Sequence, residues 1–246
     1  MSTGIWSAAS GAVAQGFSLD VAANNIANAT TPGFRSDKAV FRQELAKAVQ
    51  RGETPSLRYA LVRNAVVDFR AGDLTPTGRP LDVALRTDDT FFVVRTRDGE
   101  RYTRAGGVQI SSDGSLTMAD GTPYLGPDRK IMKAPMEAGT VAFSKDGRLI
   151  VDGVEGTQQL LVVSFKTPAA LVRDGNVMFR APPAAGRPVE APADLEIGAL
   201  EGSNASAVGG MTSIVTASRQ FEMLTRVIEA FSTIDRKAAT DVMAKR

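Results

Sequence analysis

The C-terminal stretch from Ile214 to Val242 constrains the fold of this chain most strongly. Apolar or small residues recur there three and four positions apart, with Asp235 at the one polar position, in the series Ile214, Ala217, Phe221, Leu224, Ile228, Phe231, Ala238 and Val242. This is the heptad pattern of a helix that packs along another helix. Met223, Val227 and Ile234 widen the apolar face beyond what one partner helix covers, so we expect several neighbours.

The N-terminal segment has the same spacing but smaller side chains, in the series Ile5, Ala9, Ala12, Gly16, Leu19, Ala23 and Ile26. Small residues allow a second backbone to approach closely, so the two terminal segments are predicted to pair. The predicted assembly interface consists of Ile5, Ala12, Leu19, Ile26, Ile214, Phe221, Leu224, Val227, Ile228 and Phe231. The alternative interpretation is that both are ordinary core helices of one globular domain.

Composition narrows the function classes. The 246 residues include 29 Lys and Arg against 27 Asp and Glu, and no aromatic-interleaved basic run of the kind that binds nucleic acid is present. The absence of Cys and His removes thiolate and imidazole nucleophiles, the usual general base and the usual transition-metal ligands. Most familiar catalytic designs are therefore unavailable, and we expect no catalytic or metal-binding residue and no cofactor.

Targeting signals are also absent from the sequence. The N-terminus lacks a basic region followed by an unbroken apolar stretch, so a cleaved signal peptide is not expected. Apolar runs are too short to span a bilayer, so no membrane insertion is expected. Any export would need another route.

The ends of the chain are predicted to be helical. The first helix should begin after Ser2-Thr3 and end near Asn28, because the Pro32-Gly33 step breaks helices. The last helix should begin near Met211, since Gly209-Gly210 disfavours a helix. Residues 39–49 have the spacing of a short helix, and residues 51–77 resemble an extended connector with short strands.

The middle of the chain is predicted to be antiparallel β-structure. Three Asp-Gly pairs, at Asp98, Asp113 and Asp146, each lie between alternating apolar segments, which favours tight hairpins with positive φ. The predicted fold is therefore α+β, with paired terminal helices forming a coiled-coil layer and an inserted β-rich domain. Residues 1–35 and 205–246 would form the helical domain, 36–77 a connector, and 78–204 the β domain.

Candidate sites for chemistry are few. Asp88-Asp89 is the closest carboxylate pair, but adjacent strand residues point to opposite faces, so a solvated turn is the better interpretation. Arg101, Arg104, Asp113 and Asp146 are interpreted as hairpin and surface residues. The sequence contains no phosphate loop, dinucleotide fingerprint or nucleophile elbow.

Two motifs at opposite ends carry a family resemblance. Asn24, Asn25 and Asn28, followed by Pro32-Gly33-Phe34-Arg35, are similar to the N-terminal signature of bacterial flagellar rod and hook proteins. Glu201-Gly202-Ser203-Asn204, followed by the heptad segment, resembles their C-terminal signature. Arg79 to Leu85 looks most like the proximal rod member of the long rod proteins, whereas Thr87 to Thr90 stands where distal rod and hook proteins usually have glycines.

The resemblance implies a structural subunit of the basal-body rod, most similar to the proximal rod protein. It implies partners that are other rod subunits and copies of the chain itself, in a helical assembly that crosses the periplasm and transmits torque from motor to hook. It also implies passage through the flagellar type III export apparatus without signal cleavage. The alternatives are a distal rod or hook-type subunit, a carboxylate-dependent enzyme on a β scaffold, and a coiled-coil surface adhesin.

Overall fold

A computed structural model describes residues 3–44 and 60–244. The chain folds into two compact units. The first, the helical unit, consists of residues 1–27, 37–66 and 206–246, and the second, the β unit, consists of residues 28–36 and 67–205. The arrangement is α+β, as the sequence predicts, with a helix at each end and antiparallel sheets between them.

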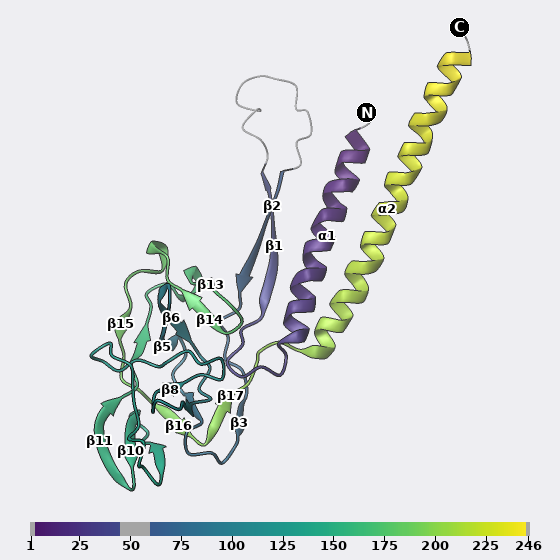
Figure 1. Ribbon diagram of the computed structural model, residues 1–246. Helices are drawn as coiled ribbons and strands as arrows, with labels where there is room; N and C mark the ends of the chain where they lie inside the picture. The colour runs from purple at the N-terminus through teal and green to yellow at the C-terminus, as the bar shows by residue number, and fades with distance from the viewer. Residues whose placement is uncertain (1–2, 45–59, 245–246) are drawn as a thin grey trace. The chain divides into compact units, whose positions relative to one another are not determined.

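Two long helices form the helical unit (Figure 1). Helix α1 (Thr3–Ala27) and helix α2 (Ala207–Ala244) lie side by side and pack against each other. Strands β1 (Asp37–Glu44) and β2 (Ala60–Val67) pair in a two-stranded sheet, and β1 contacts α1. The α1 bounds agree with the predicted first helix. The side chains of the seam residues Ala238 and Val242 lie outside the described part of α2.

Helix α2 begins earlier than predicted. The helix includes Gly209 and Gly210, because the hydroxyl of Ser206 accepts a hydrogen bond from the Gly209 N–H at 3.1 Å and caps the first turn. Gly210 also lies against α1, where an added Cβ would stand 2.4 Å from Cγ1 of Ile26. The glycines that argued against a helix on propensity are therefore explained by the cap and by close packing.

The short helix predicted for 39–49 is wrong over the described residues. Residues 37–44 form β1 instead, because the strand pairing with β2 overrides a helix-like spacing in a short apolar run, and residues 45–49 lie outside the described residues. The two short strands expected at 60–62 and 65–67 form the single strand β2. The stretch predicted as a connector, 36–77, is divided between the two units, with 37–66 in the helical unit and Ser36 and 67–77 in the β unit.

The main sheet of the β unit has six strands in the order β13-β14-β6-β5-β12-β15, with antiparallel neighbours. Their bounds are β5 (Thr90–Thr96), β6 (Gly99–Thr103), β12 (Val162–Ser164), β13 (Val172–Arg173), β14 (Met178–Arg180) and β15 (Val189–Glu190). Two 3-10 turns, η2 (Pro168–Ala170) and η3 (Pro183–Ala185), lie between these strands in the sequence.

Smaller sheets complete the β unit. A three-stranded sheet has the order β11-β10-β9, and two-stranded sheets pair β7 with β8, β16 with β4, and β17 with β3. The bounds are β3 (Leu74–Pro76), β4 (Val83–Leu85), β7 (Gln109–Ile110), β8 (Leu116–Thr117), β9 (Val141–Phe143), β10 (Arg148–Val151), β11 (Val154–Gln159), β16 (Leu195–Ile197) and β17 (Ala199–Glu201).

The three predicted hairpins are confirmed as β5–β6, β7–β8 and β9–β10. Each is joined through its Asp-Gly pair, and Gly99, Gly114 and Gly147 all have positive φ. An Asp-Gly pair adopts this backbone readily, because glycine has no Cβ to clash there.

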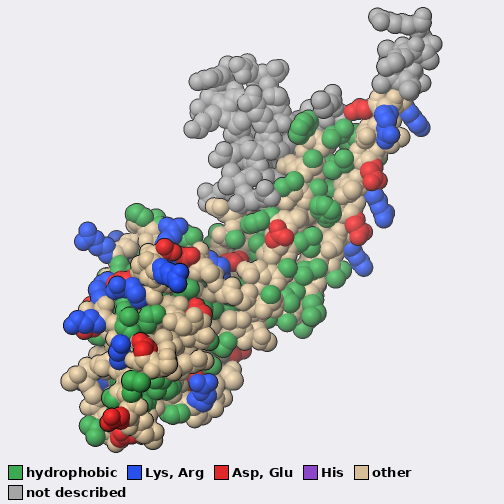
Figure 2. Space-filling view, in the orientation of Figure 1, with side chains coloured by type: hydrophobic (Ala, Val, Ile, Leu, Met, Phe, Trp, Pro, Cys, Tyr) green, Lys and Arg blue, Asp and Glu red, His purple; other side chains and the backbone are tan. Residues whose placement is uncertain are grey.

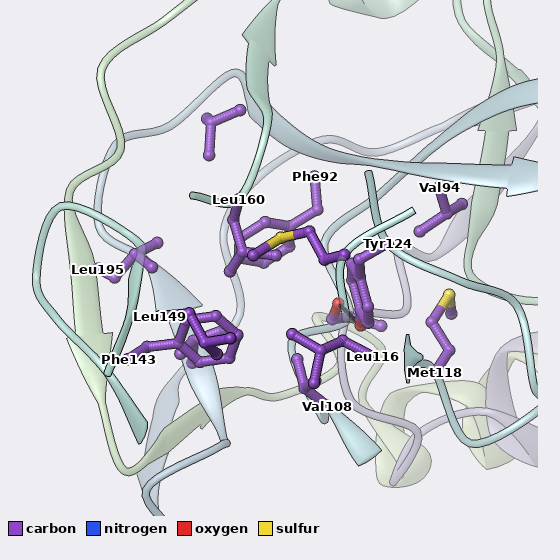
Figure 3. Packing of buried hydrophobic residues seen from close by; sticks show 14 of the residues in the cluster. Phe92, Val94, Val108, Leu116, Met118, Tyr124, Phe143, Leu149, Leu160 and Leu195 are labelled. Carbon is purple, nitrogen blue, oxygen red and sulfur yellow. Dashed lines mark hydrogen bonds between the residues drawn. The ribbon is translucent and has the colours of Figure 1, made fainter. Parts of the chain in front are cut away.

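Two apolar clusters hold the β unit together. One surrounds Tyr124, whose ring meets that of Phe92 edge to face and whose hydroxyl donates to the Ala105 carbonyl at 2.9 Å (Figure 3). The other contains Phe91, Phe165 and Phe179. The main sheet separates them, because successive residues of a strand face opposite sides and adjacent Phe91 and Phe92 enter different clusters.

No described helix is both long enough and apolar enough to cross a membrane.

Candidate assembly site

Helices α1 and α2 approach closely at glycines. An added Cβ at Gly4 would lie 2.7 Å from the Phe231 ring, and one at Gly11 would lie 3.1 Å from Leu224. Together with Gly210 against Ile26, these contacts place glycines of both helices opposite larger side chains of the partner. The chain thus packs small against large, as the two terminal patterns predict.

The predicted interface residues occupy different environments. Ala12 is buried, whereas the other predicted residues of α1 (Ile5, Leu19 and Ile26) and most of those on α2 (Ile214, Leu224, Ile228 and Phe231) are half-buried. Gly16 and Ala23 do not follow the expected small face, since nothing lies near an added Cβ at Gly16 and Ala23 is exposed. The small face runs instead through Gly4, Ala8 and Gly11.

A second set of apolar side chains on this unit faces outward. Phe221 and Val227 of the predicted interface are 40% and 38% exposed, and beside them Met223 and Ile234 are 62% and 60% exposed. The exposed apolar residues of both helices, here called the open apolar face, are Trp6, Val13, Val208, Met211, Val215, Phe221, Met223, Val227 and Ile234. Figure 2 shows hydrophobic side chains gathered along the helix pair, with charged groups along one edge of α2.

The two family motifs meet inside the β unit. The Gly33 N–H donates to the Glu201 carbonyl at 2.7 Å, and the Asn204 side chain accepts from the Ser36 N–H at 2.6 Å. The amide nitrogen of Asn204 also donates to the carbonyls of Asp68 and Arg70, at 2.8 Å each. We call this region the motif junction: residues 33–36, 68–72, Arg104 and 201–204.

Glu201 lies at the centre of the motif junction and is 1% exposed. One carboxylate oxygen pairs with Arg35 and also accepts from the Gly72 N–H at 3.1 Å, while the other accepts from Nε of Arg104 at 2.7 Å. Both arginines are buried as well. Burial lowers the pKa of the Arg35 guanidinium below its ordinary value, against the opposing effect of Glu201.

Arg104 corrects a sequence interpretation. It is not a surface residue, because it is 2% exposed and its guanidinium donates to the carbonyls of Leu85, Thr87 and Thr90 at 2.7 to 3.0 Å. Arg101 is also buried and pairs with Asp174, whereas Asp113 and Asp146 are exposed as expected. The only sequence signal for Arg104 was the acidic Glu201 of the C-terminal motif, which needs a cationic partner once it is buried.

Close backbone contacts also define the motif junction. Gly33 has a φ of 74°, and an added Cβ there would stand 2.3 Å from the Ala105 nitrogen. Gly72 is similarly crowded by the Gly202 carbonyl. The guanidinium of Arg173 lies 4.6 Å from the Phe34 ring centroid and donates to the Arg35 carbonyl, which holds the N-terminal motif against the β unit.

The remaining motif residues have structural positions. Asn25 and Asp37, both in the helical unit, exchange two hydrogen bonds at 2.8 Å between the Asn25 side chain and the Asp37 backbone. The Asn28 side chain is buried and accepts from the Thr31 hydroxyl at 3.3 Å. Asn24 is half-buried on α1, Pro32 is exposed in the turn, and the Ser203 hydroxyl accepts from the Ala205 N–H at 3.1 Å.

The candidate carboxylate pair does not form a site. Asp88 and Asp89 lie exposed in a turn, as the sequence suggested, with Asp89 at a φ of 59°. Within the described residues, no three acidic, His or Cys side chains come together where they could hold a metal ion.

Comparisons with known proteins match three parts of the chain. Residues 5–35 match the flagella basal body rod protein family, residues 87–151 match the flagellar hook protein FlgE/F/G D1 domain, and residues 197–241 match the flagellar basal body rod FlgEFG protein C-terminal family. The first and last matches contain the two motifs that meet at Glu201.

Relatives match across most of the chain. The flagellar basal-body rod protein FlgG of Agrobacterium fabrum is 32% identical over 90% of this chain and 92% of its own length. FlgF of Salmonella typhimurium is 34% identical over 85% of both chains, and FlgF of Caulobacter vibrioides is 29% identical over 89% of both. The chain therefore belongs to the family of flagellar basal-body rod proteins.

Proposed function

We propose that this chain is a proximal-rod subunit of the flagellar basal body, in which it joins copies of itself and other rod subunits in a helical assembly. Its family consists of structural rod proteins, so the chain is a structural subunit of the rod and not an enzyme. The proposal extends this to the position in the rod, the mode of assembly and the transmission of torque from motor to hook.

The open apolar face carries the assembly proposal. Side chains as large as Trp6 and Met223 are more than 60% exposed on the helical unit, although each would contribute about 1.5 to 3 kcal/mol if it were fully buried. Several large apolar side chains exposed on one helix pair are more than isolated surface residues, and such surface is typical of an interaction site. Neighbouring subunits with their own terminal helices would cover it.

A tube follows from simple geometry. Contacts between different patches of identical subunits generate an open helical assembly when the rotation does not close. In our proposal, α1 and α2 form an inner coiled-coil layer and the β unit faces outward. Residues 1–35 and 205–246 would then make the assembly contacts, and residues 78–204 would form the outer surface.

The proximal position is supported by the sequence around β4. Arg79 to Leu85 resembles the proximal member, and Thr87 to Thr90 replaces the glycines usual in distal rod and hook proteins. Relatives named FlgF and FlgG match at similar identity. A distal-rod or hook-type subunit therefore remains the alternative that the experiment below must separate.

The proposal includes the route to the periplasm. The chain would pass through the flagellar type III export apparatus and keep its N-terminus, as its resemblance to flagellar rod and hook proteins implies. Mass spectrometry of the chain recovered from basal bodies would then show a peptide that includes Ile5 and Trp6. A mature form that begins after the α1 seam would contradict this route.

The experiment for the position is a deletion strain examined by electron microscopy of purified basal bodies. Loss of a proximal subunit should leave basal bodies without a rod beyond the motor, whereas loss of a distal or hook subunit should leave a rod stub of normal proximal length. Wild-type chain supplied in trans should restore the full rod and swimming. Complete rods and normal swimming in the deletion strain would reject the proposal.

A further inference from the structure

The chain passes between the two units four times, after Ala27, Ser36, Val66 and Ala205. Three of these crossings are held together at the motif junction by hydrogen bonds within the β unit. Asn204 accepts from the Ser36 N–H and donates to the Asp68 carbonyl, and the Asp68 N–H donates to the Ser36 carbonyl at 2.8 Å. The first crossing, after Ala27, leads into residues 28–36, where the Gly33 N–H donates a hydrogen bond to the Glu201 carbonyl.

These backbone links allow some freedom, because hydrogen bonds between extended segments can re-form after a shift of register. Between 33–36 and 201–204, the backbone hydrogen bonds run from the Gly33 N–H to the Glu201 carbonyl and, at 3.4 Å, from the Asn204 N–H to the Phe34 carbonyl, so backbone pairing alone specifies the register weakly. The ion pair between Arg35 and Glu201 cannot slip in this way, since a shift would leave the buried Arg35 without the carboxylate that compensates its charge, while Glu201 would keep Arg104.

The same pair is a poor source of net stability. Arg35 is 2% exposed, and its Nε and Nη1 have no hydrogen-bond partner among residues 3–44 and 60–244, which the structure describes. Two arginines face the single carboxylate of Glu201, and burial lowers the pKa of Arg35, which means that desolvation opposes its charge. Buried ion pairs with incomplete hydrogen bonding are often matched or exceeded in stability by apolar replacements.

We propose that the Arg35–Glu201 pair is a registry device, which fixes the position of the passage 28–36 against the passage 201–204 rather than adding to the stability of the β unit. The pair joins the segment that follows α1 to the segment that precedes α2, residues 166 apart in sequence. It therefore links, within the β unit, the two passages that continue into α1 and α2. This inference concerns the isolated chain and does not depend on the position proposed for it in the rod.

The test uses the full chain with the double substitution Arg35→Met and Glu201→Gln. This removes one positive and one negative charge, while the side-chain amide oxygen introduced at position 201 can still accept from Arg104, whose three carbonyl partners stay in place. The matched control is Arg86→Met with Glu196→Gln, which makes the same chemical change at an exposed pair of the β unit. The chain has no native Cys, so cysteines introduced at the exposed Thr30 and Ser112 take spin labels specifically.

Two quantities are measured on each chain: the unfolding equilibrium constant of the β unit from denaturant titration, and the width of the distance distribution between the two labels. For the junction double variant, we expect the unfolding constant to change by less than about tenfold and the distance distribution to broaden. The control should change neither. An increase of about tenfold or more in the unfolding equilibrium constant would show that the pair stabilises the β unit. An unchanged distance distribution would show that the register is fixed without the pair. Either result overturns the inference.

Discussion

At the scale of single residues, Phe221 shows how one side chain can serve two contacts. It occupies a seam position of α2 and remains 40% exposed, so part of its ring lies on the open apolar face. Its neighbour Gln220 is exposed and polar. The pair offers a direct test of whether the open apolar face is an assembly surface.

Changing Phe221 to Asp should block rod assembly and swimming while leaving the β unit folded. The substitution removes an apolar contact worth about 1.5 to 3 kcal/mol when buried and would place an unpaired carboxylate in the subunit interface. The measurement is swimming of a deletion strain that carries the variant, with circular dichroism of the purified chain. Gln220→Asp adds the same charge one position along, and a strain that carries it should swim normally. Normal swimming of the Phe221→Asp strain would show that the open apolar face is not an assembly surface.

Removal of the Glu201 carboxylate is predicted to lower the stability of the β unit. Changing Glu201 to Ala leaves Arg35 and Arg104 without their carboxylate and the Gly72 N–H without its acceptor. The free energy of unfolding of the β unit should fall by about 3 to 5 kcal/mol, the usual cost of removing one partner from a buried ionic group.

The control for this change is Glu196→Ala, because Glu196 is 46% exposed and pairs with an exposed Arg86. Its loss should cost about 0 to 1 kcal/mol in the same denaturant titration. Equal losses of unfolding free energy for the two variants would mean that burial of Glu201 does not increase its contribution to stability. The prediction differs from the registry test, which removes Arg35 together with the charge of Glu201 and keeps an acceptor for Arg104.

At the scale of elements, two glycines of α2 allow the effect of helix packing to be distinguished from the effect of helix propensity. Gly209 and Gly210 are adjacent, but only Gly210 meets α1, with Ile26 at 2.4 Å from an added Cβ. At Gly209 the nearest atom is the Ser206 hydroxyl, at 3.3 Å.

Gly210→Ala should therefore impair swimming, since the helices must separate to admit the methyl group. Gly209→Ala should leave swimming unchanged or improve assembly, because alanine favours a helix by about 1 kcal/mol over glycine. Swimming rates in the deletion strain give the comparison. The packing argument fails if the two alanine variants behave alike.

Part of this structure follows from local sequence patterns. The Asp-Gly turns and the alternating segments beside them gave the three hairpins, and the heptad spacing gave both helices, because these signals depend only on neighbours in the chain. The early start of α2 and the strand at 37–44 could not be predicted from local patterns, because each depends on a distant segment. Gly210 packs against α1, and β1 pairs with β2.

The motif junction shows the same limit more clearly. Both motifs could be located in the sequence, but their meeting at Glu201 joins Arg35 to a residue 166 positions away. Arg104 looked like a hairpin residue because it follows a strand and precedes glycines. Its burial is decided by Glu201 and by three carbonyls of 85–90, which sequence spacing does not bring together.

The terminal helices are predicted to be largely unfolded in the free monomer and to become ordered in the assembly. Among the described side chains of α1, the buried ones are alanines, Ala8, Ala12, Ala14 and Ala22, and the described part of α2 adds Ala217. Such burial is small against an ordering cost of about 1 to 2 kcal/mol per residue.

Amide hydrogen exchange on dilute monomer and on assembled rod measures this directly. Residues 5–26 and 214–242 should exchange rapidly in the monomer and slowly in the rod. Strong protection of both segments in the monomer would show that one chain supplies enough burial, and the coupling of folding to assembly would be rejected.

At the scale of the whole molecule, the β unit has its own apolar clusters and should resist proteases by itself. Brief digestion of the monomer should leave a core that begins between Arg51 and Thr77 and ends near Leu200 to Ala205, with the passage 28–36 retained on it by the contacts of Gly33 and Arg35 with Glu201. The C-terminal limit follows from Glu201, which is buried within this unit. Mass spectrometry of the fragments provides the bounds, and a resistant core that keeps both termini would contradict the independence of the β unit.

The central claim is that this chain is a proximal-rod subunit that assembles through its terminal helices. Electron cryomicroscopy of purified basal bodies, at a resolution that traces side chains, tests it most directly. The account predicts copies of this chain in the rod segment nearest the motor, with Phe221, Met223 and Ile234 buried against helices of neighbouring subunits. Density for the chain elsewhere in the basal body, or in the rod with these three side chains still facing solvent, would contradict it.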